Sequence, residues 1–253
     1  MTSVAALYSG GADESSELLF SYMAVQPTAA RKVVLNTFIT TLKGAGIWQK
    51  LDLLYVLAAH DAQAARLNWI APQTYPLVQS GTVTFTADQG FTGNATDGRL
   101  DVSGTWTPGQ MTQNSALAGC YVRTAASYNG STTYHSLYTG SGRILRRPAT
   151  EANIEWRIND GTTGTTGVAG QTGHFAVRRT TSSERSLWRE GSQVTTATAT
   201  STANGNVFRL FNANGTGFGD PQLSLAYAGA QIDDTAMAAF NTAIGALKTG
   251  IGF

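Results

Sequence analysis

Residues 174–200 read HFAVRRTTSSERSLWREGSQVTTATAT, and this stretch decides the fold. Apolar and polar side chains alternate in HFAVRR (174–179) and again in SLWREG (186–191), which is the period of a β-strand. In TTATATSTA (195–203) Thr alternates with Ala and no large apolar residue occurs, so we expect an edge or outer strand. The stretch therefore predicts consecutive antiparallel strands.

The same texture extends from about residue 77 to 229, a region with 21 of the 28 glycines and no lysine. Further strand-like runs are TVTFTA (82–87), RLDVSG (99–104), ALAGCYVR (116–123), IEWRI (154–158) and NVFRLF (206–211). Turn-forming pairs separate the runs, at Asp97-Gly98, Asn129-Gly130, Asp160-Gly161, Asn204-Gly205 and Asn214-Gly215. Many short strands between such turns predict a mainly β fold, an antiparallel jelly-roll sandwich. The low-complexity stretch at 161–173 is expected to be an exposed loop.

Both ends of the chain show helical patterns instead. Residues 12–68 are expected to be helical, with a second helix starting near Pro27, a third apolar one over 47–57 and a short fourth at DAQAARLNW (61–69). A closing helix is expected after Asp233 or Asp234. Its apolar face carries Met237, Phe240, Ile244 and Leu247. We therefore divide the chain into a helical region, 1–75, and a jelly roll with its closing helix, 76–253.

Composition excludes several classes of protein. Charged residues make up 13% of the chain, about half the usual share, and the net charge of +1 gives no global field for nucleic acid. Cys120 is the single cysteine, so no internal disulfide is expected. We therefore expect the chain to fold in a reducing cytoplasm. The first 16 residues do not resemble a signal peptide, and no apolar run is long enough for a membrane span.

The segment SLWREGSQVTTATATSTA (186–203) resembles the laminin-G-like, or concanavalin A-like, jelly roll. The family pattern of strand, Gly turn and strand is matched by Leu187, Trp188, Gly191 and Val194. Residues 85–102, preceded by the segment 42–69, and residues 225–252 resemble a subgroup of such domains in tailed-bacteriophage and prophage virion proteins. The resemblance covers the chain from about residue 35 to its end.

This resemblance implies a virion surface component: a tail fibre, a tail-tip protein or a head decoration that touches host glycans. Its partners would be other virion subunits, further copies of the same chain in a closed symmetric oligomer, and host polysaccharide. The expected location is the virion, after synthesis in the bacterial cytoplasm. Nucleic acid and membrane insertion are not expected.

Catalytic groups are sparse. Glycosidases of this fold carry Glu-x-Asp-x-x-Glu on one strand, and the chain contains no Glu-x-Asp. The nearest acidic pair is Glu151 with Glu155, which four residues of strand would separate by about 13 Å. No Gly-x-Ser-x-Gly elbow occurs, and Cys120 lies in an apolar strand where a buried, inert thiol is expected. We expect no enzyme activity, no metal and no cofactor.

Sugar binding is the one chemistry that the residue types permit, because aromatic faces and neutral polar groups hold carbohydrates. The candidate residues for a glycan site or a subunit interface are Tyr121, Tyr128, Tyr134, Tyr138, Arg143 and Trp188. The four tyrosines also suit strands and subunit interfaces, a use that we rate above sugar binding, and Trp188 suits the core or the wall of a cleft.

Three functions stay open from the sequence. The first is a structural and recognition protein of a phage or phage-like particle. The second is a free-standing, lectin-like carbohydrate-binding module, which is compatible with the first. The third is a glycoside hydrolase of the same fold that uses an unrecognised pair of acids.

Overall fold

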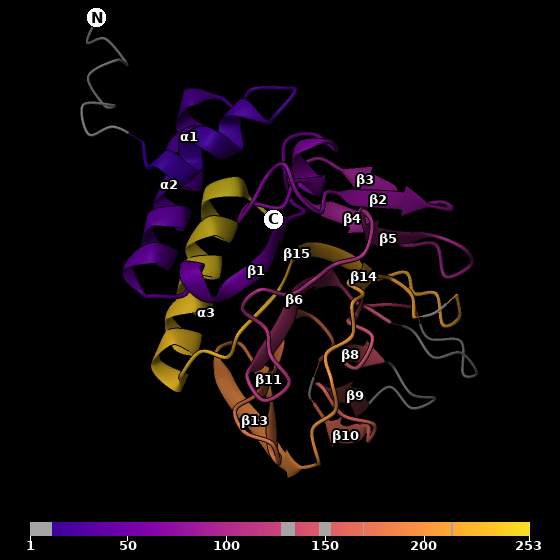
Figure 1. Ribbon diagram of the computed structural model, residues 1–253. Helices are drawn as coiled ribbons and strands as arrows, with labels where there is room; N and C mark the ends of the chain where they lie inside the picture. Colours follow the sequence, from indigo (N-terminus) through magenta and orange to yellow (C-terminus); the bar gives the residue numbers. More distant parts are fainter. Residues whose placement is uncertain (1–11, 128–134, 147–152, 169, 214) are drawn as a thin grey trace, which may run out of the picture.

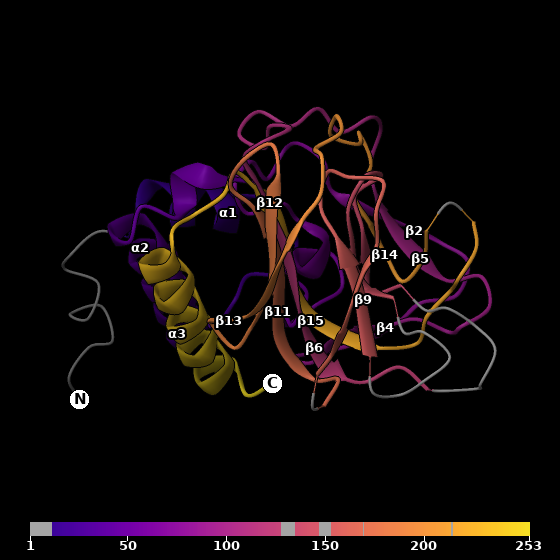
Figure 2. The ribbon, with the colours of Figure 1, turned by 90° about the horizontal axis from the view of Figure 1, so that it is seen from below.

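The computed structural model describes residues 12–127, 135–146, 153–168, 170–213 and 215–253. Three layers make up the molecule: helices, a first β-sheet and a second β-sheet. Figure 2 shows α2 and α3 on one side of the first sheet, while β9, β14 and β5 of the second sheet lie on its other side. The expected antiparallel jelly-roll sandwich with helices at both ends of the chain is confirmed.

Sheet A is the central layer. All of its strand pairs are antiparallel, and among the described residues its order is β13-β12-β11-β6-β15-β4-β3, with β1 also pairing with β15. Its strands are β1 (Leu51–Val56), β3 (Thr84–Thr86), β4 (Gly90–Thr92), β6 (Ala116–Thr124), β11 (Gly173–Arg179), β12 (Glu184–Arg189), β13 (Ser192–Thr198) and β15 (Gln222–Gly229). As expected for the Thr/Ala run, β13 is an edge strand.

Sheet B is the outer layer and is also antiparallel. Among the described residues its order is β10-β9-β8-β7-β14-β5-β2. Its strands are β2 (Leu77–Ser80), β5 (Arg99–Val102), β7 (Leu137–Tyr138), β8 (Arg143–Arg146), β9 (Asn153–Arg157), β10 (Gly164–Gly167) and β14 (Arg209–Leu210). Neighbours in this sheet come from distant parts of the chain, as the colours of Figure 1 indicate.

The central strands of sheet A are buried on both faces. All eight residues of β15 and the first seven of β6 are buried, because helices cover one face and sheet B covers the other. Cys120 is fully buried, as predicted, and burial raises the pKa of its thiol far above the ordinary value. A strand covered on both faces reads as a continuous apolar run rather than as an alternation.

The helical layer contains α1 (Glu14–Ser21), α2 (Ala29–Gly44) and α3 (Asp234–Ile251). The side chain of Asp233 caps α3 by accepting a hydrogen bond from the backbone N–H of Ala236. The four residues predicted for the apolar face of α3 are all buried. None of the helices in the described part of the chain combines the length and the apolar character of a membrane span.

Two predictions of local structure in the first part of the chain were wrong. The apolar run 47–57 is not a helix: it forms a single 3-10 turn, η2 (Trp48–Lys50), followed by strand β1 of sheet A. Continuous apolar runs do not distinguish a buried strand from a buried helix, and here pairing with β15 decides. The expected helix at 61–69 is reduced to η3 (Ala64–Arg66).

A third wrong prediction is the exposed loop at residues 161–173, because part of this segment forms β10 at the edge of sheet B. The backbone of β10 pairs with β9, and Thr166 accepts a hydrogen bond from the indole of Trp156. The division of the chain near residue 75 stays a prediction, although β1 shows that the first part contributes a strand to the sandwich.

A buried ion cluster joins the two sheets. The carboxylate of Asp160, after β9, lies 3.0 Å from Nη2 of Arg179 on β11 and 3.1 Å from Nη1 of Arg185 on β12. The Arg185 guanidinium also lies 4.8 Å from the ring centre of Trp156. All three charged side chains are at most 2% exposed, so each charge is compensated within the interior, between sheet B and sheet A.

Candidate functional site

The outer face of sheet B is the sandwich face that the helices leave open (Figure 2). Along β9 burial alternates, so Ile154 and Trp156 face the core while Asn153, Glu155 and Arg157 face outward. The same alternation in β5 turns Leu100 inward. Side chains in register with the outward residues therefore share one surface.

Strand register builds a continuous row across this surface. Each of its members lies directly opposite the next on the neighbouring strand, in the order Val78, Asp101, Arg209, Tyr138, Arg143 and Arg157. Directly opposed side chains on one face have Cβ atoms about 5 Å apart. The row thus brings three arginines, one carboxylate and one aromatic ring together from five strands, and Arg99 adds a fourth guanidinium beside Asp101.

Asp101 organises one end of the row. Its Oδ2 accepts a hydrogen bond from Nε of Arg99 at 2.7 Å, and its Oδ1 accepts one from Nε of Arg209. Both arginines use Nε for Asp101, and the structure gives no hydrogen bond from their Nη groups to any described residue. These Nη groups are the donors that a planar acceptor such as a carboxylate binds best.

A polar pocket of about 190 Å³ opens beside this ion pair. It is lined by Asp101, Val102, Gly104, Asn206, Val207, Phe208 and Arg209. The residues that line the pocket include a carboxylate, a guanidinium and a neutral amide. This combination suits a small polar ligand.

The middle of the row is aromatic. The guanidinium of Arg143 lies 5.9 Å from the ring centre of Tyr138, and the ring of His135 meets the same ring edge-on at 6.3 Å. Tyr138 is only 5% exposed and lies outside the continuous apolar core. Because the ring is buried, the contact holds Arg143 in place over it and leaves the guanidinium, not the ring, toward the surface.

The residues predicted from sequence meet only in part. Tyr138 and Arg143 lie together in the row, as just described. Tyr121 lies on the other sheet, beneath the helices, where its hydroxyl accepts a hydrogen bond from Nζ of Lys248 at 2.8 Å. Trp188 is 3% exposed and stacks under Arg178, so it belongs to the interior. Tyr128 and Tyr134 lie outside the described residues.

Sequence reasoning missed Arg99, Asp101, Arg157 and Arg209. The alternation in RLDV would have placed Arg99 and Asp101 on one face of a strand. Nothing in the sequence indicated that residues 101 and 209, which are 108 positions apart, would face each other. That contact depends on the order of strands in sheet B.

Acidic residues on this surface are far apart. Asp101 on β5 and Glu155 on β9 are separated by four strand steps, or about 19 Å, whereas glycosidase acids lie roughly 5–9.5 Å apart. Glu151 lies outside the described residues, so the predicted Glu151–Glu155 pair stays a prediction. Among the described residues no group of three or more His, Cys, Asp or Glu side chains is placed to hold a metal ion.

Comparison with known proteins shows which solved structures share this fold. No family model matches the chain, and no curated protein matches it. Solved structures that are similar include the botulinum neurotoxin serotype D binding domain, with a TM-score of 0.55, 8% identity and coverage of 78% of this chain and 52% of that one. Another is the binding domain of Paraclostridial Mosquitocidal Protein 1, with a TM-score of 0.50, 11% identity and coverage of 76% and 51%.

A third similar structure concerns botulinum neurotoxin type C, whose cell entry is described as dependent upon interaction with two ganglioside molecules. Its TM-score is 0.52 at 10% identity, with coverage of 79% of this chain and 53% of that one. The chain thus spans about half the length of the structures it matches. At such low identity the likeness defines a class by fold alone: a β-sandwich of the kind found in toxin binding domains.

Proposed function

We propose that this chain is a non-catalytic recognition protein of a phage or phage-like particle, and that the open face of sheet B contacts host-surface carbohydrate. The observation that carries the proposal is the cross-strand row running from Val78 to Arg157, with the polar pocket at Asp101 and Arg209. It lies on the sandwich face that the helices leave open.

The chemistry of the row favours a sugar that carries acid groups. Four described guanidiniums, Arg99, Arg209, Arg143 and Arg157, share the surface with two described carboxylates, Asp101 and Glu155. An arginine fork binds a carboxylate bidentately, while Asp101 and Asn206 can accept or donate to hydroxyl groups. The buried Tyr138 ring packs beneath Arg143 and supports that guanidinium at the surface.

The proposed place on a virion rests on the sequence resemblance to phage jelly-roll proteins and on the low charge of the chain. The similar structures support a role in binding rather than in catalysis. Two of them are toxin binding domains, and a third concerns a toxin whose cell entry depends upon interaction with ganglioside molecules. The alternative of a free-standing lectin-like module uses the same surface.

A glycan array probed with the full chain tests the carbohydrate claim, followed by titration of the best ligand. Arg209→Ala should weaken binding at least about tenfold, because it removes one fork beside the pocket. Arg123→Ala is the matched control, since Arg123 hydrogen-bonds Gln222 in sheet A, and it should leave affinity unchanged. No signal above background for the wild type, or equal affinity of Arg209→Ala, would overturn the proposed site.

Two further measurements separate the alternatives. Gold-labelled antibody against the chain should decorate intact particles in electron micrographs, and label found only on free protein would favour the lectin-like module. Incubation of the bound glycan with the wild type should release no sugar. Release that is lost in Asp101→Asn or Glu155→Gln would instead establish a glycosidase.

A further inference from the structure

The outer face of the helical layer carries almost no charge. Between Val33 and Gly44 of α2, every exposed residue is Val, Thr or Gly. Between Thr235 and Leu247 of α3, every exposed residue is Thr, Ala or Gly. A helix face that meets water usually carries charged side chains, so this face has the composition of a contact surface.

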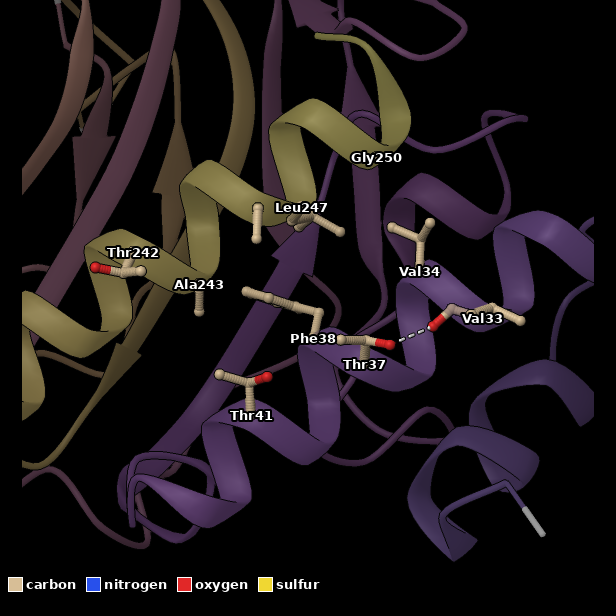
Figure 3. A pocket seen from close by; sticks show the side chains of 10 residues that line it. Val33, Val34, Thr37, Phe38, Thr41, Thr242, Ala243, Leu247 and Gly250 are labelled. Atoms are coloured by element: carbon tan, nitrogen blue, oxygen red, sulfur yellow. Dashed lines mark hydrogen bonds between the residues drawn. The ribbon is translucent and has the colours of Figure 1, made fainter. Parts of the chain in front are cut away.

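A groove runs between the two helices on this face (Figure 3). Its volume is about 250 Å³, and no charged residue lines it. Phe38 of α2 and Leu247 of α3 lie toward its floor, and Thr242 and Ala246 border it along α3. At one end the helices approach so closely that a Cβ on Gly250 would lie 2.6 Å from a methyl of Val34.

Most of the exposed apolar side chains belong to the first part of the helical layer. Among the described residues, six large hydrophobic side chains are exposed, and four of them belong to α1, α2 or the loop between these helices. They are Leu18 (44% exposed), Tyr22 (42%), Val25 (55%) and Val33 (47%). Isolated exposed apolar residues need no explanation, but these four lie within 16 residues of the chain, and one of them, Val33, lines the groove.

Charges occur at the two ends of the layer, with opposite signs. Because Val34 meets Gly250 and α2 ends near Asp233, α2 and α3 are antiparallel. The end at the start of α2 carries Lys32, Lys248, whose Nζ donates to the Tyr121 hydroxyl, and the ion pair of Arg31 with Asp88. The opposite end carries Glu14 and Asp233, the ion pairs Asp13–Lys43 and Asp234–Arg178, and Lys50.

The size of the face matches a modest dimer interface. Helices of 16 and 18 residues are about 24 and 27 Å long, and neighbouring helix axes lie about 8–10 Å apart. With α1 alongside, the face covers about 600 Å² per copy, or about 1,200 Å² for two copies. That value reaches the lower limit of specific protein–protein interfaces.

We propose that this helical face, defined by α1, α2 and α3, binds the same face of a second copy of this chain. The two-fold axis lies in the interface and runs across the helices. It places the cationic end of one copy over the acidic end of the other, with Lys32 near the partner's Glu14. An isologous interface has to be self-complementary, and opposite charges at the two ends of one face meet that condition. Sheet B stays open in both copies.

Analytical ultracentrifugation of the full chain over a concentration series tests this proposal. The wild type should form a dimer. Thr242→Glu and Ala246→Glu each place a charge in the uncharged face and should weaken dimerisation at least about 30-fold. Thr105→Glu, an equally exposed change on a sandwich loop, should leave it unchanged. Thermal melting checks that each variant is folded.

A charge-exchange experiment tests the orientation. Lys32→Glu and Glu14→Lys should each dimerise more weakly, because like charges then meet at both ends. An equimolar mixture of the two variants should dimerise about as well as the wild type. The proposal is overturned if the wild type stays monomeric at every soluble concentration, or if both glutamate substitutions leave the dimer unaffected. It is also overturned if the mixture dimerises no more strongly than either variant alone, or if a different particle protein binds this face in place of a second copy.

Discussion

The ring of Tyr227 on β15 occupies the space directly above Gly119 on β6. The two residues are paired across the strands, and a Cβ on Gly119 would lie 2.2 Å from the Tyr227 hydroxyl oxygen. The absent side chain lets the Tyr227 hydroxyl reach His174 on β11, where its oxygen lies 2.7 Å from Nε2. The contact between Tyr227 and His174 therefore links β15 to β11 across β6, beneath α3, and it depends on the absence of a side chain at Gly119.

Gly119→Ala should destabilise the protein by about 1–3 kcal/mol or more, because the buried Tyr227 ring has to move. Urea unfolding followed by tryptophan fluorescence measures the change. Gly161→Ala is the matched control, since nothing lies within 4 Å of the added carbon. Equal stability of the two variants would contradict the steric argument.

Stability should fall between pH 6.5 and pH 4 because of His174. Burial lowers the pKa of this imidazole from 6.5 to about 4, although a hydrogen bond to Asn241 and the charge of Glu190 act in the opposite direction. The unfolded chain then binds more protons in this window, so the contribution of neutral His174, about 3 kcal/mol at most, is present above pH 6.5 and lost as pH falls toward 4.

Urea unfolding at pH 7.5, 5.5 and 4.5 measures this dependence. His174→Gln should lower stability at neutral pH and flatten the slope between pH 6.5 and 4, because glutamine hydrogen-bonds without titrating. An unchanged slope in that variant would assign the pH dependence to other groups.

Asp160→Asn should cost about 3–5 kcal/mol, because it leaves Arg179 and Arg185 as uncompensated buried charges. Asp88→Asn offers a comparison: Asp88 pairs with Arg31 at 2.6 Å, but its side chain is 41% exposed, so the loss should stay below about 1 kcal/mol. Thermal unfolding of both variants beside the wild type gives the ranking. A small effect at Asp160 would show that water reaches the cluster.

Cys120 should be inert in the folded protein. Its thiol is fully buried between the sheets and burial raises its pKa, so the reactive thiolate is scarce. Labelling by a thiol reagent should be slow in buffer and rapid in concentrated urea. A Thr105→Cys variant supplies an exposed thiol that should react at once, and equally fast labelling of Cys120 would contradict its burial.

Some of the fold follows from local pattern alone. The period of α3 and its Asp233 cap, the alternating strands β5 and β9 and the Thr/Ala edge strand β13 were all predictable, because one buried face imposes a repeat on the sequence. The segment 47–57 was not predictable, because β1 is covered on both faces and such a strand shows no repeat.

The candidate site likewise has features that the sequence predicts and features that only the tertiary structure shows. The sequence by itself determined which residue types were present: few acids at catalytic spacing, one cysteine, and Tyr138 and Arg143 near each other along the chain. Only the tertiary structure decided that Tyr121 lies beneath the helices, and that Asp101 and Arg209 face each other beside a pocket. The physical reason is strand order: a sheet joins residues that a hundred positions separate, and no local repeat encodes which strands become neighbours.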